Sequence, residues 1–298
     1  MTNTIHIPVL LKEALSNLDI QPNDTIADFT VGFGGHASHI IEKLNQDGRY
    51  IGIDQDITAV NHCKQKFKSM KNVSIYHSNY HSFDNIFQKE NIKKIDKVLI
   101  DLGVSSKQFD DFSRGFSHRE DATLDMRMDQ SCNLTAKDIL NTYSKHELSD
   151  IFYNYGELIH NKKLVENIVY HRKKHTINTT FELCELIKKS YYFNNNRKNQ
   201  IKIYSQVFQA LRIEVNKEFE VLQNTLTKLY SYLKETSVVF VITFHSLEDK
   251  LVKTLVKSSS TYYFSPKKVI KPSYEEKKKN SRARSAHGRV IRVKSHTQ

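Results

Sequence analysis

The chain contains 298 residues, of which 39% are hydrophobic, and it carries a formal net charge of +12 at pH 7. This length supports a substantial buried core, whereas the longest apolar runs are far too short for a membrane span, which argues against a membrane protein. The three cysteines are far apart and form no CxxC pair, so neither a disulfide framework nor a metal site is indicated and a cytoplasmic location is expected.

The first hundred residues alternate between strand and helix signals. The strand segments are TIADFTVG (25–32), RYIGIDQD (49–56), VSIYHSN (73–79) and KVLIDLGV (97–104). Helices are predicted from about His36 to Leu44 and from about Thr58 to Phe67. Strands that alternate with helices in this way predict an α/β fold with a doubly wound, mostly parallel sheet.

Helical signals without strong strands follow from residue 106 to residue 205. Two helix starts carry capping boxes, Ser144 with Glu147 and Thr179 with Glu182. The polar stretch FNNNRKNQ (193–200) breaks the helical pattern once. This region is predicted to be an inserted all-helical domain.

The sheet pattern returns in the last third of the chain. Leu211, Val215 and later leucines up to Leu233 recur at helical spacing and predict one long amphipathic helix. The buried strand VVFVITF (238–244), a helix near 247–256 and a strand near 289–293 come next. We therefore predict one discontinuous domain, residues 1–105 and 206–298, interrupted by the insert, residues 106–205.

The first strand ends in a glycine turn, DFTVGFGGHASHI, that suits a bound nucleotide. Gly32, Gly34 and Ala37 match the dinucleotide fingerprint, and Asp54 ends the second strand about twenty residues later, where a carboxylate accepts ribose hydroxyls. On this evidence an NAD-dependent oxidoreductase is allowed, as is a turn that only connects a strand to a helix.

Three further features favour S-adenosylmethionine over a dinucleotide. Asp28 and Thr30 precede Gly32 in a pattern that resembles the first motif of methyltransferases, with Thr30 at the first glycine position. Asp101 ends the fourth strand, at the edge where open α/β sheets bind ligands. His36 directly follows the glycine turn, where a pyrophosphate would need free backbone N–H groups.

Arginine is clustered in two short stretches. Seven of the eleven arginines lie there, namely Arg114, Arg119, Arg127, Arg282, Arg284, Arg289 and Arg292. Guanidinium groups bind phosphates and base edges in a bidentate manner, so this clustering favours a nucleic-acid partner. The alternatives are a solvated basic tail at the C-terminus and ion pairs within residues 114–129.

Six segments in order carry a resemblance to a known family. They are HIPVLLKEAL, GFGGHASHI, IDLGVSSKQFDDFSRGFSHREDATLDMRMD, FQALRIEVNKEFE, TFHSLEDKLVK and NSRARSAHGRV. Together they make the chain closely similar to the RsmH/MraW family of bacterial small-subunit rRNA methyltransferases. The resemblance implies a class I (Rossmann-like) methyltransferase fold with a helical insert, S-adenosyl-L-methionine as cofactor, and 16S rRNA of the small ribosomal subunit as partner. It also implies methylation of the exocyclic N4 amine of cytidine 1402, in conventional rRNA numbering, and is compatible with a homodimer.

The resemblance assigns cofactor contacts to residues of both predicted domains. Together with Gly32 from the fingerprint, they are Gly34, Gly35, His36, Asp54, Tyr80, Asp101 and Gln108. Tyr80 is expected beside the adenine and Asp54 on the ribose. Ser105 and Ser106 are expected to steer the substrate together with Gln108.

The chemistry expected at the nucleobase requires a hydrogen-bond acceptor. The lone pair of the cytosine amine is delocalised, and Asp101 is the candidate to accept one of its N–H groups; alternatively Asp101 binds only the cofactor. Methylation at ring carbon 5 is disfavoured because no cysteine follows any of the four prolines, and the Asp/Asn-Pro-Pro-Tyr loop of many DNA amino-methyltransferases is absent.

The segment FHSLED places His245 at the same edge of the sheet. His245 is a candidate to contact the substrate or accept a proton, or else it forms a structural hydrogen bond at the turn. Ser246 is the candidate N-cap of the next helix, with Asp249 completing the cap. Arg114, Arg119, Arg127, Arg282 and Arg284 are the candidates for RNA phosphates. A non-catalytic rRNA-binding assembly factor is the remaining alternative.

Overall fold

The computed structural model describes residues 8–194 and 196–295, and its chain divides into two compact units. The first consists of Met1–Gly103 and Phe219–Gln298, and the second is Val104–Glu218. The first boundary falls close to the predicted residue 105, while the second falls beyond the predicted residue 205. The sequence assigns methyl transfer to the discontinuous domain and substrate recognition to the inserted helical domain, and this assignment stays a prediction.

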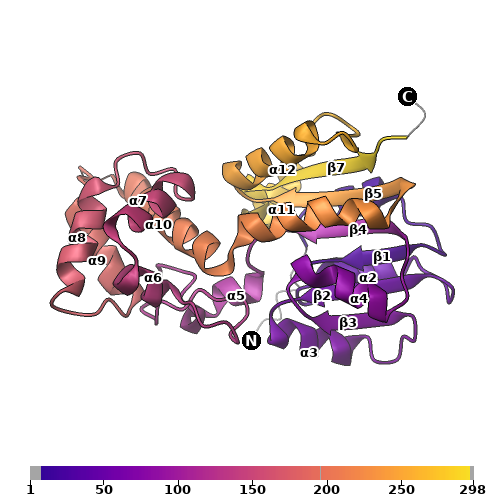
Figure 1. Ribbon diagram of the computed structural model, residues 1–298, viewed down its shortest axis with the longest axis horizontal. Coiled ribbons are helices and arrows are strands. Elements are labelled where there is room, and N and C mark those ends of the chain that lie inside the picture. The colour runs from indigo at the N-terminus through magenta and orange to yellow at the C-terminus, as the bar shows by residue number, and fades with distance from the viewer. Residues whose placement is uncertain (1–7, 195, 296–298) are drawn as a thin grey trace. The chain divides into compact units, whose positions relative to one another are not determined.

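The first unit is built on a seven-stranded sheet with the strand order β3-β2-β1-β4-β5-β7-β6 (Figure 1). Its strands are β1 (Thr25–Asp28), β2 (Arg49–Asp54), β3 (Val73–His77), β4 (Ile95–Asp101), β5 (Leu233–Thr243), β6 (Tyr262–Phe264) and β7 (His287–Val293). Strands β1 to β5 pair in parallel, and β7 pairs antiparallel with β5 and with β6. The predicted α/β fold with a mostly parallel sheet is confirmed.

Helices cover both faces of this sheet, because the strands bury apolar side chains on both sides. One face packs against α1 (Leu11–Leu18), α2 (Gly35–Ile41) and α3 (Ile57–Lys66). The other packs against α4 (Phe83–Lys89), α11 (Glu218–Leu229) and α12 (Ser246–Ser258). In β1, Ile26 points to the first face and Ala27 to the second, as the alternation of a strand requires. This double winding brings the carboxyl ends of β1, β2 and β4 to one edge.

The basic C-terminal stretch is folded onto the first unit. It forms α13 (Tyr274–Lys279), the 3₁₀ turn η4 (Ser281–Ser285) and β7. The carboxylate of Glu276 accepts the backbone N–H of Leu10 at 2.7 Å, and Ala283 and Ala286 are buried in the core. The alternative of a solvated tail is therefore wrong for this segment.

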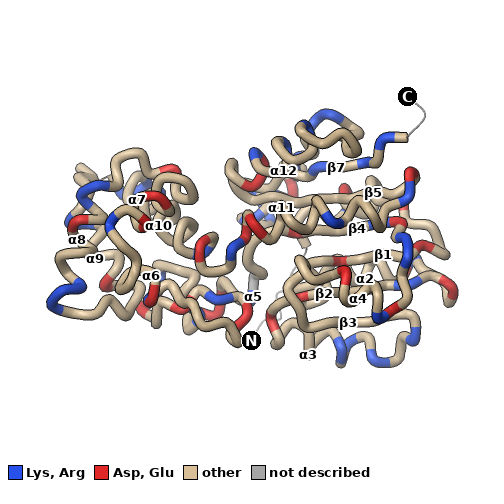
Figure 2. Tube along the Cα trace, viewed as in Figure 1, with Lys and Arg blue, Asp and Glu red and all other residues tan. Residues whose placement is uncertain are grey.

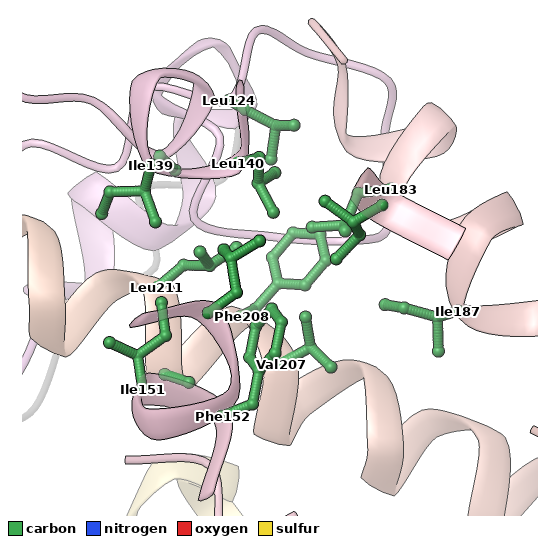
Figure 3. Packing of buried hydrophobic residues seen from close by; sticks show 14 of the residues in the cluster. Leu124, Ile139, Leu140, Ile151, Phe152, Leu183, Ile187, Val207, Phe208 and Leu211 are labelled. Carbon is green, nitrogen blue, oxygen red and sulfur yellow. The ribbon is translucent and has the colours of Figure 1, made fainter. Parts of the chain in front are cut away.

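The regular secondary structure of the second unit, among its described residues, consists of helices together with one isolated bridge between Thr123 and Thr179. Its helices are α5 (Ser106–Asp110), the 3₁₀ turn η2 (Phe112–Arg114), α6 (Ala136–Thr142), α7 (Lys145–Asn154), α8 (Lys162–Arg172), α9 (Thr180–Ser190) and α10 (Arg197–Asn216). Both predicted capping boxes are confirmed, at Ser144 and at Thr179. The helices share one apolar core, in which Phe152, Phe208 and Leu211 pack together (Figure 3).

The single long helix predicted up to Leu233 is wrong. The chain forms α10 and α11, and between them Lys217 adopts the left-handed conformation with φ of 50°. The side chain of Asn216 accepts the N–H of Met128 at 2.7 Å and donates to the carbonyl of Met126 at 2.8 Å, contacts that end α10 inside the second unit. Leu233 begins β5 instead of closing a helix.

The helices α1 and α13 and the three-residue strand β6 of the first unit are not predicted from the sequence. Among residues 8–194 and 196–295, none of the helices has both the length and the apolar character to cross a membrane.

Adjacent residues of α7 test the core of the second unit. Phe152 is fully buried and Tyr153 is 56% exposed. We expect Phe152→Ala to lower the free energy of unfolding by about 3–5 kcal/mol, because a large cavity remains. Tyr153→Ala should change it by less than about 0.5 kcal/mol. Urea denaturation followed by circular dichroism measures both, and equal effects of the two substitutions would contradict this packing.

Candidate active site

Three adjacent strands end in an aspartate at the same edge of the sheet. Asp28 ends β1, Asp54 ends β2 and Asp101 ends β4, and β1 lies between the other two strands. The carboxyl edge of an open α/β sheet is where ligands bind. The predicted convergence of Asp54 and Asp101 on one edge therefore follows from the strand order.

Asp28 is fully buried and connects this edge by hydrogen bonds. Its Oδ2 accepts the hydroxyl of Tyr50 at 2.7 Å, and its Oδ1 accepts the N–H of Thr30 at 3.1 Å. Burial raises the pKa of Asp28 to about 6, against the opposing effect of these two donors. The hydroxyl oxygen of Thr30 accepts the backbone N–H of Asp101 at 2.7 Å. Thr30, at the first glycine position of the motif, thus joins β1 to β4.

Asp54 holds the glycine turn. Its Oδ2 accepts the N–H of Gly32 at 2.8 Å, and its Oδ1 accepts the N–H of Asp56 at 2.8 Å. Burial is the main cause that raises the pKa of Asp54 to about 6. Each carboxylate oxygen has a second acceptor position, so ribose hydroxyls can still bind there.

Two glycines of the turn are required for different reasons. Gly34 has φ of +75° and lies directly before α2, a conformation that favours glycine. A Cβ atom on Gly35 would lie 2.7 Å from Cγ of Pro8. At Gly35 the missing side chain therefore makes room for the N-terminal segment of the chain itself, a contact that sequence reasoning missed.

His36 lies between the N-terminal segment and Asp101. Its Nε2 is 3.1 Å from the carbonyl oxygen of Val9, and its Nδ1 is 3.7 Å from Oδ2 of Asp101. Because a carbonyl only accepts, Nε2 carries a proton, and Nδ1 faces the carboxyl group. His36 is buried, and its predicted contact with the cofactor stays a prediction.

Asp101 has a carboxyl oxygen without a hydrogen-bond donor among the described residues. Its Oδ1 is buried and accepts no hydrogen bond from any residue that the structure describes. Burial raises the pKa of Asp101 well above its usual range, and the charges of Asp28 and Glu248 raise it further. The ionised form of such a carboxyl group is stabilised by a nearby cation or by an N–H donor. The sulfonium group of S-adenosylmethionine and an exocyclic amine fit these two requirements.

His245 is the N-cap of α12, and the predicted N-cap Ser246 is wrong. Nδ1 of His245 accepts the N–H of Glu248 at 3.4 Å, and Nε2 lies 2.9 Å from the Glu248 carboxylate. The Nδ1 contact is a structural hydrogen bond at the turn, and a contact of His245 with the substrate stays a prediction. Asp249 instead binds the guanidinium group of Arg289, at 2.8 and 3.1 Å.

Tyr80 is buried at the start of the 3₁₀ turn η1 (Tyr80–Ser82), after β3. Its ring is stacked on Phe29, with 5.9 Å between centroids and 8° between planes. Phe29 directly follows Asp28, so this stack lies next to the strand ends. The predicted contact of Tyr80 with an adenine stays a prediction.

The predicted residues of α5 form a capping box in the second unit. Ser105 is the N-cap and accepts the N–H of Gln108 at 3.2 Å, while Oε1 of the buried Gln108 accepts the N–H of Ser105 at 2.8 Å. Ser106 is the first residue of α5. Cofactor and substrate contacts of this helix stay predictions.

Two of the three arginines predicted to bind phosphates in residues 114–129 have contacts inside the second unit. Arg114 is buried and donates to the carbonyls of Arg127 and Met128 at 2.8 and 3.1 Å. Arg127 forms a bidentate pair with Asp125 at 2.8 and 2.7 Å. Arg127 therefore forms an ion pair within residues 114–129, which was the alternative to a phosphate contact. We do not propose phosphate contacts for Arg114 or Arg127. Arg119 is exposed, with its guanidinium 5.9 Å from the Phe109 ring centroid.

In the first unit, Arg282 is half-buried and Arg284 is exposed, both in η4. Nε of Arg284 donates to the carbonyl of Lys277 at 3.4 Å.

Sequence reasoning missed Tyr50 as the partner of Asp28, because a tyrosine in an apolar strand gives no signal of its own. Thr30 had a signal, as the residue that departs from the glycine motif.

The sequence model of the MraW methylase family matches residues 3–294. The chain belongs to the MraW methylase family. A protein named Ribosomal RNA small subunit methyltransferase H from Clostridium botulinum (strain Loch Maree / Type A3) is 40% identical, over 96% of this chain and 98% of the relative. Proteins of the same name from Bacteroides thetaiotaomicron and Fusobacterium nucleatum are 40% and 39% identical, over 98% and 97% of this chain and 98% and 97% of the relatives. Membership in this family decides between the two cofactor classes, in favour of S-adenosylmethionine.

The pKa of Asp54 predicts how cofactor binding depends on pH. Below about pH 6 Asp54 and Asp28 are protonated, so they attract a cation less and accept hydroxyls less strongly. We expect the affinity for S-adenosylmethionine to rise as the pH increases from 5 to 7. Asp54→Asn should bind more weakly with a flatter pH profile, whereas Asp47→Asn in an exposed loop should match the parent. Calorimetric titrations at each pH measure this, and a parental affinity that falls across this range would refute the assignment.

Proposed function

We propose that the protein transfers the methyl group of S-adenosylmethionine to the exocyclic N4 amine of cytidine 1402 in the decoding region of 16S rRNA. The observation that carries the proposal is the buried Oδ1 of Asp101, which has no hydrogen-bond donor among the described residues and lies at the ligand edge of the sheet. The name of the 39–40% identical relatives supports the small-subunit rRNA as substrate. The expected location is the cytoplasm, and the resemblance is compatible with a homodimer.

The carboxyl edge of the sheet would hold the cofactor. When bound, S-adenosylmethionine supplies a methyl group on a positively charged sulfur, which needs no further activation. Asp54 accepts the ribose hydroxyls through its remaining acceptor positions, and the turn at Gly34 and Gly35 provides a backbone surface without side chains. Tyr80 and Gln108 are the proposed further contacts. Because these groups are fixed by their own hydrogen bonds, binding requires little rearrangement.

Asp101 would orient the amine and receive its proton. Oδ1 accepts one N–H of the exocyclic amine, which localises the nitrogen lone pair for attack. The raised pKa of Asp101 also suits it to hold the proton that the amine releases. His36 and Thr30 fix the carboxyl group through the contacts at Nδ1 and at the backbone N–H. Correct positioning of two reactants is worth effective molarities on the order of 10⁵ M.

The RNA would be held by exposed arginines. We assign phosphate contacts to Arg119, Arg282 and Arg284, which have exposed or half-buried side chains. The target base must leave its stack to reach the edge of the sheet, which costs a few kcal/mol and less in irregular RNA than in a duplex. Phosphate contacts offset that cost.

Replacement of one carboxylate oxygen tests the role of Asp101. We expect Asp101→Asn to lower kcat by about 10² or more, because the amide neither takes a proton nor carries a charge. Binding of small-subunit rRNA should be unchanged. Mass spectrometry of the rRNA measures methylation and filter binding measures affinity, with Asp47→Asn as the matched control. Methylation by Asp101→Asn at the parental rate would contradict the role. A parent that binds the rRNA without methylating it would point to the assembly-factor alternative.

A further inference from the structure

The outer face of α8 carries lysines beside an exposed tyrosine, and no contact described above uses them. We define the α8 stripe as Lys163, Tyr170, Lys173 and Lys174, all exposed. Figure 2 marks the Lys and Arg positions along the chain, those of α8 among them, in blue. Lys163 and Tyr170 are seven residues apart, which is two helical turns, so they share a face about 10 Å long. Lys174 follows one turn later, in the segment that continues the helix through the hydrogen bond of its N–H to the carbonyl of His171 at 2.9 Å.

This surface has an excess of basic residues, and its one acidic residue is paired with a lysine of another helix. Residues 159–175 contain five lysines and arginines and a single carboxylate, Glu166. The ammonium group of Lys145, on α7, lies 3.0 Å from Glu166 and lowers the pKa of that carboxyl. Glu166 therefore stays ionised and is compensated locally. The lysines of the α8 stripe retain their charge for a partner.

Tyr170 presents an aromatic ring to solvent within this charge. Its side chain is 64% exposed, and Nζ of Lys174 lies 4.9 Å from the ring centroid. The opposite side of α8 buries Leu164, Val165 and Ile168 in the core of the second unit, so the stripe is held on a rigid element. Lysines that bind phosphates beside an aromatic ring that stacks on a base are the arrangement that binds single-stranded nucleic acid.

We propose that the α8 stripe binds single-stranded RNA, with Tyr170 stacked on an unpaired base and its three lysines on phosphates. The identity of that RNA as the 16S rRNA rests on the proposed function. The α8 stripe belongs to the second unit and includes none of the aspartates at the strand ends. Its contribution is affinity for the substrate, separate from cofactor binding and methyl transfer.

Two variants of the full chain separate the charge from the ring. With a 16S rRNA fragment that contains the decoding region, we expect Lys163→Ala/Lys173→Ala/Lys174→Ala to raise Kd at least tenfold. The slope of log affinity against log salt should become shallower by about 2, or about 0.7 for each phosphate that a lysine no longer neutralises. Tyr170→Ala should raise Kd about tenfold with an unchanged slope, because stacking involves no counterion, and Tyr170→Phe should bind like the parent.

Kinetics and a matched lysine variant serve as controls. The triple lysine variant and Tyr170→Ala, the two stripe variants, should raise KM for the RNA. In both, kcat at saturating RNA and the affinity for S-adenosylmethionine should be unchanged. Lys68→Ala/Lys71→Ala/Lys93→Ala removes the same charge from exposed positions just before β3 and β4, at the amino ends of the strands and opposite the carboxyl edge of the sheet. This control variant should bind RNA like the parent. Thermal unfolding checks that every variant is folded.

Three results would overturn the inference. They are parental RNA affinity in both stripe variants, an equal loss in the control lysine variant, and loss of binding to phosphatidylserine vesicles with RNA binding intact. The last result would assign the α8 stripe to a lipid surface. If the parent does not methylate the fragment but the stripe variants still lose affinity for it, the α8 stripe binds RNA and the proposed methylation target is wrong.

Discussion

The buried carboxylate of Asp28 joins three strands where they end. It accepts the hydroxyl of Tyr50 from β2 and the N–H of Thr30 beyond β1, and Thr30 in turn accepts the N–H of Asp101 from β4. A buried carboxylate without such donors would be strongly unfavourable, so this network fixes one arrangement of the edge. Asp54 and Asp101 depend on it for their positions, because both continue strands that it ties together.

The electrostatics of the site follow from the same burial. Asp28, Asp54 and Asp101 gather at one edge, and burial is the main cause that raises the pKa of each. An edge of this kind binds a cation more strongly than a neutral molecule or a pyrophosphate. This explains physically why a glycine fingerprint shared with dinucleotide enzymes serves a sulfonium cofactor in the MraW methylase family. The fold supplies the charge, and in the proposed function exposed arginines and lysines outside the edge supply affinity for RNA.

The sequence predicted the parts of the structure that depend on local patterns. Alternating strands and helices indicated the sheet, and the capping boxes at Ser144 and Thr179 marked helix starts correctly. Long-range contacts were not predictable: the break at Lys217 depends on Asn216 binding a distant loop, and Arg114 is buried by carbonyls more than ten residues away. At the site, the strand ends located Asp28, Asp54 and Asp101, whereas the Tyr50 hydroxyl that serves Asp28 and the Pro8 that occupies the space beside Gly35 become visible only in three dimensions.

In the proposed function, half-buried Asp101, whose Oδ1 is buried without a hydrogen-bond donor among the described residues, lies beside a cationic ligand. The most direct measurement is a titration of the aspartate side-chain carbons by NMR, in the free protein and with S-adenosylmethionine or S-adenosylhomocysteine bound. We expect a pKa of Asp101 well above that of an ordinary aspartate in the free protein, and a larger decrease of this pKa with the sulfonium compound than with the neutral thioether. An ordinary pKa in the free protein, or equal decreases with the two ligands, would contradict it.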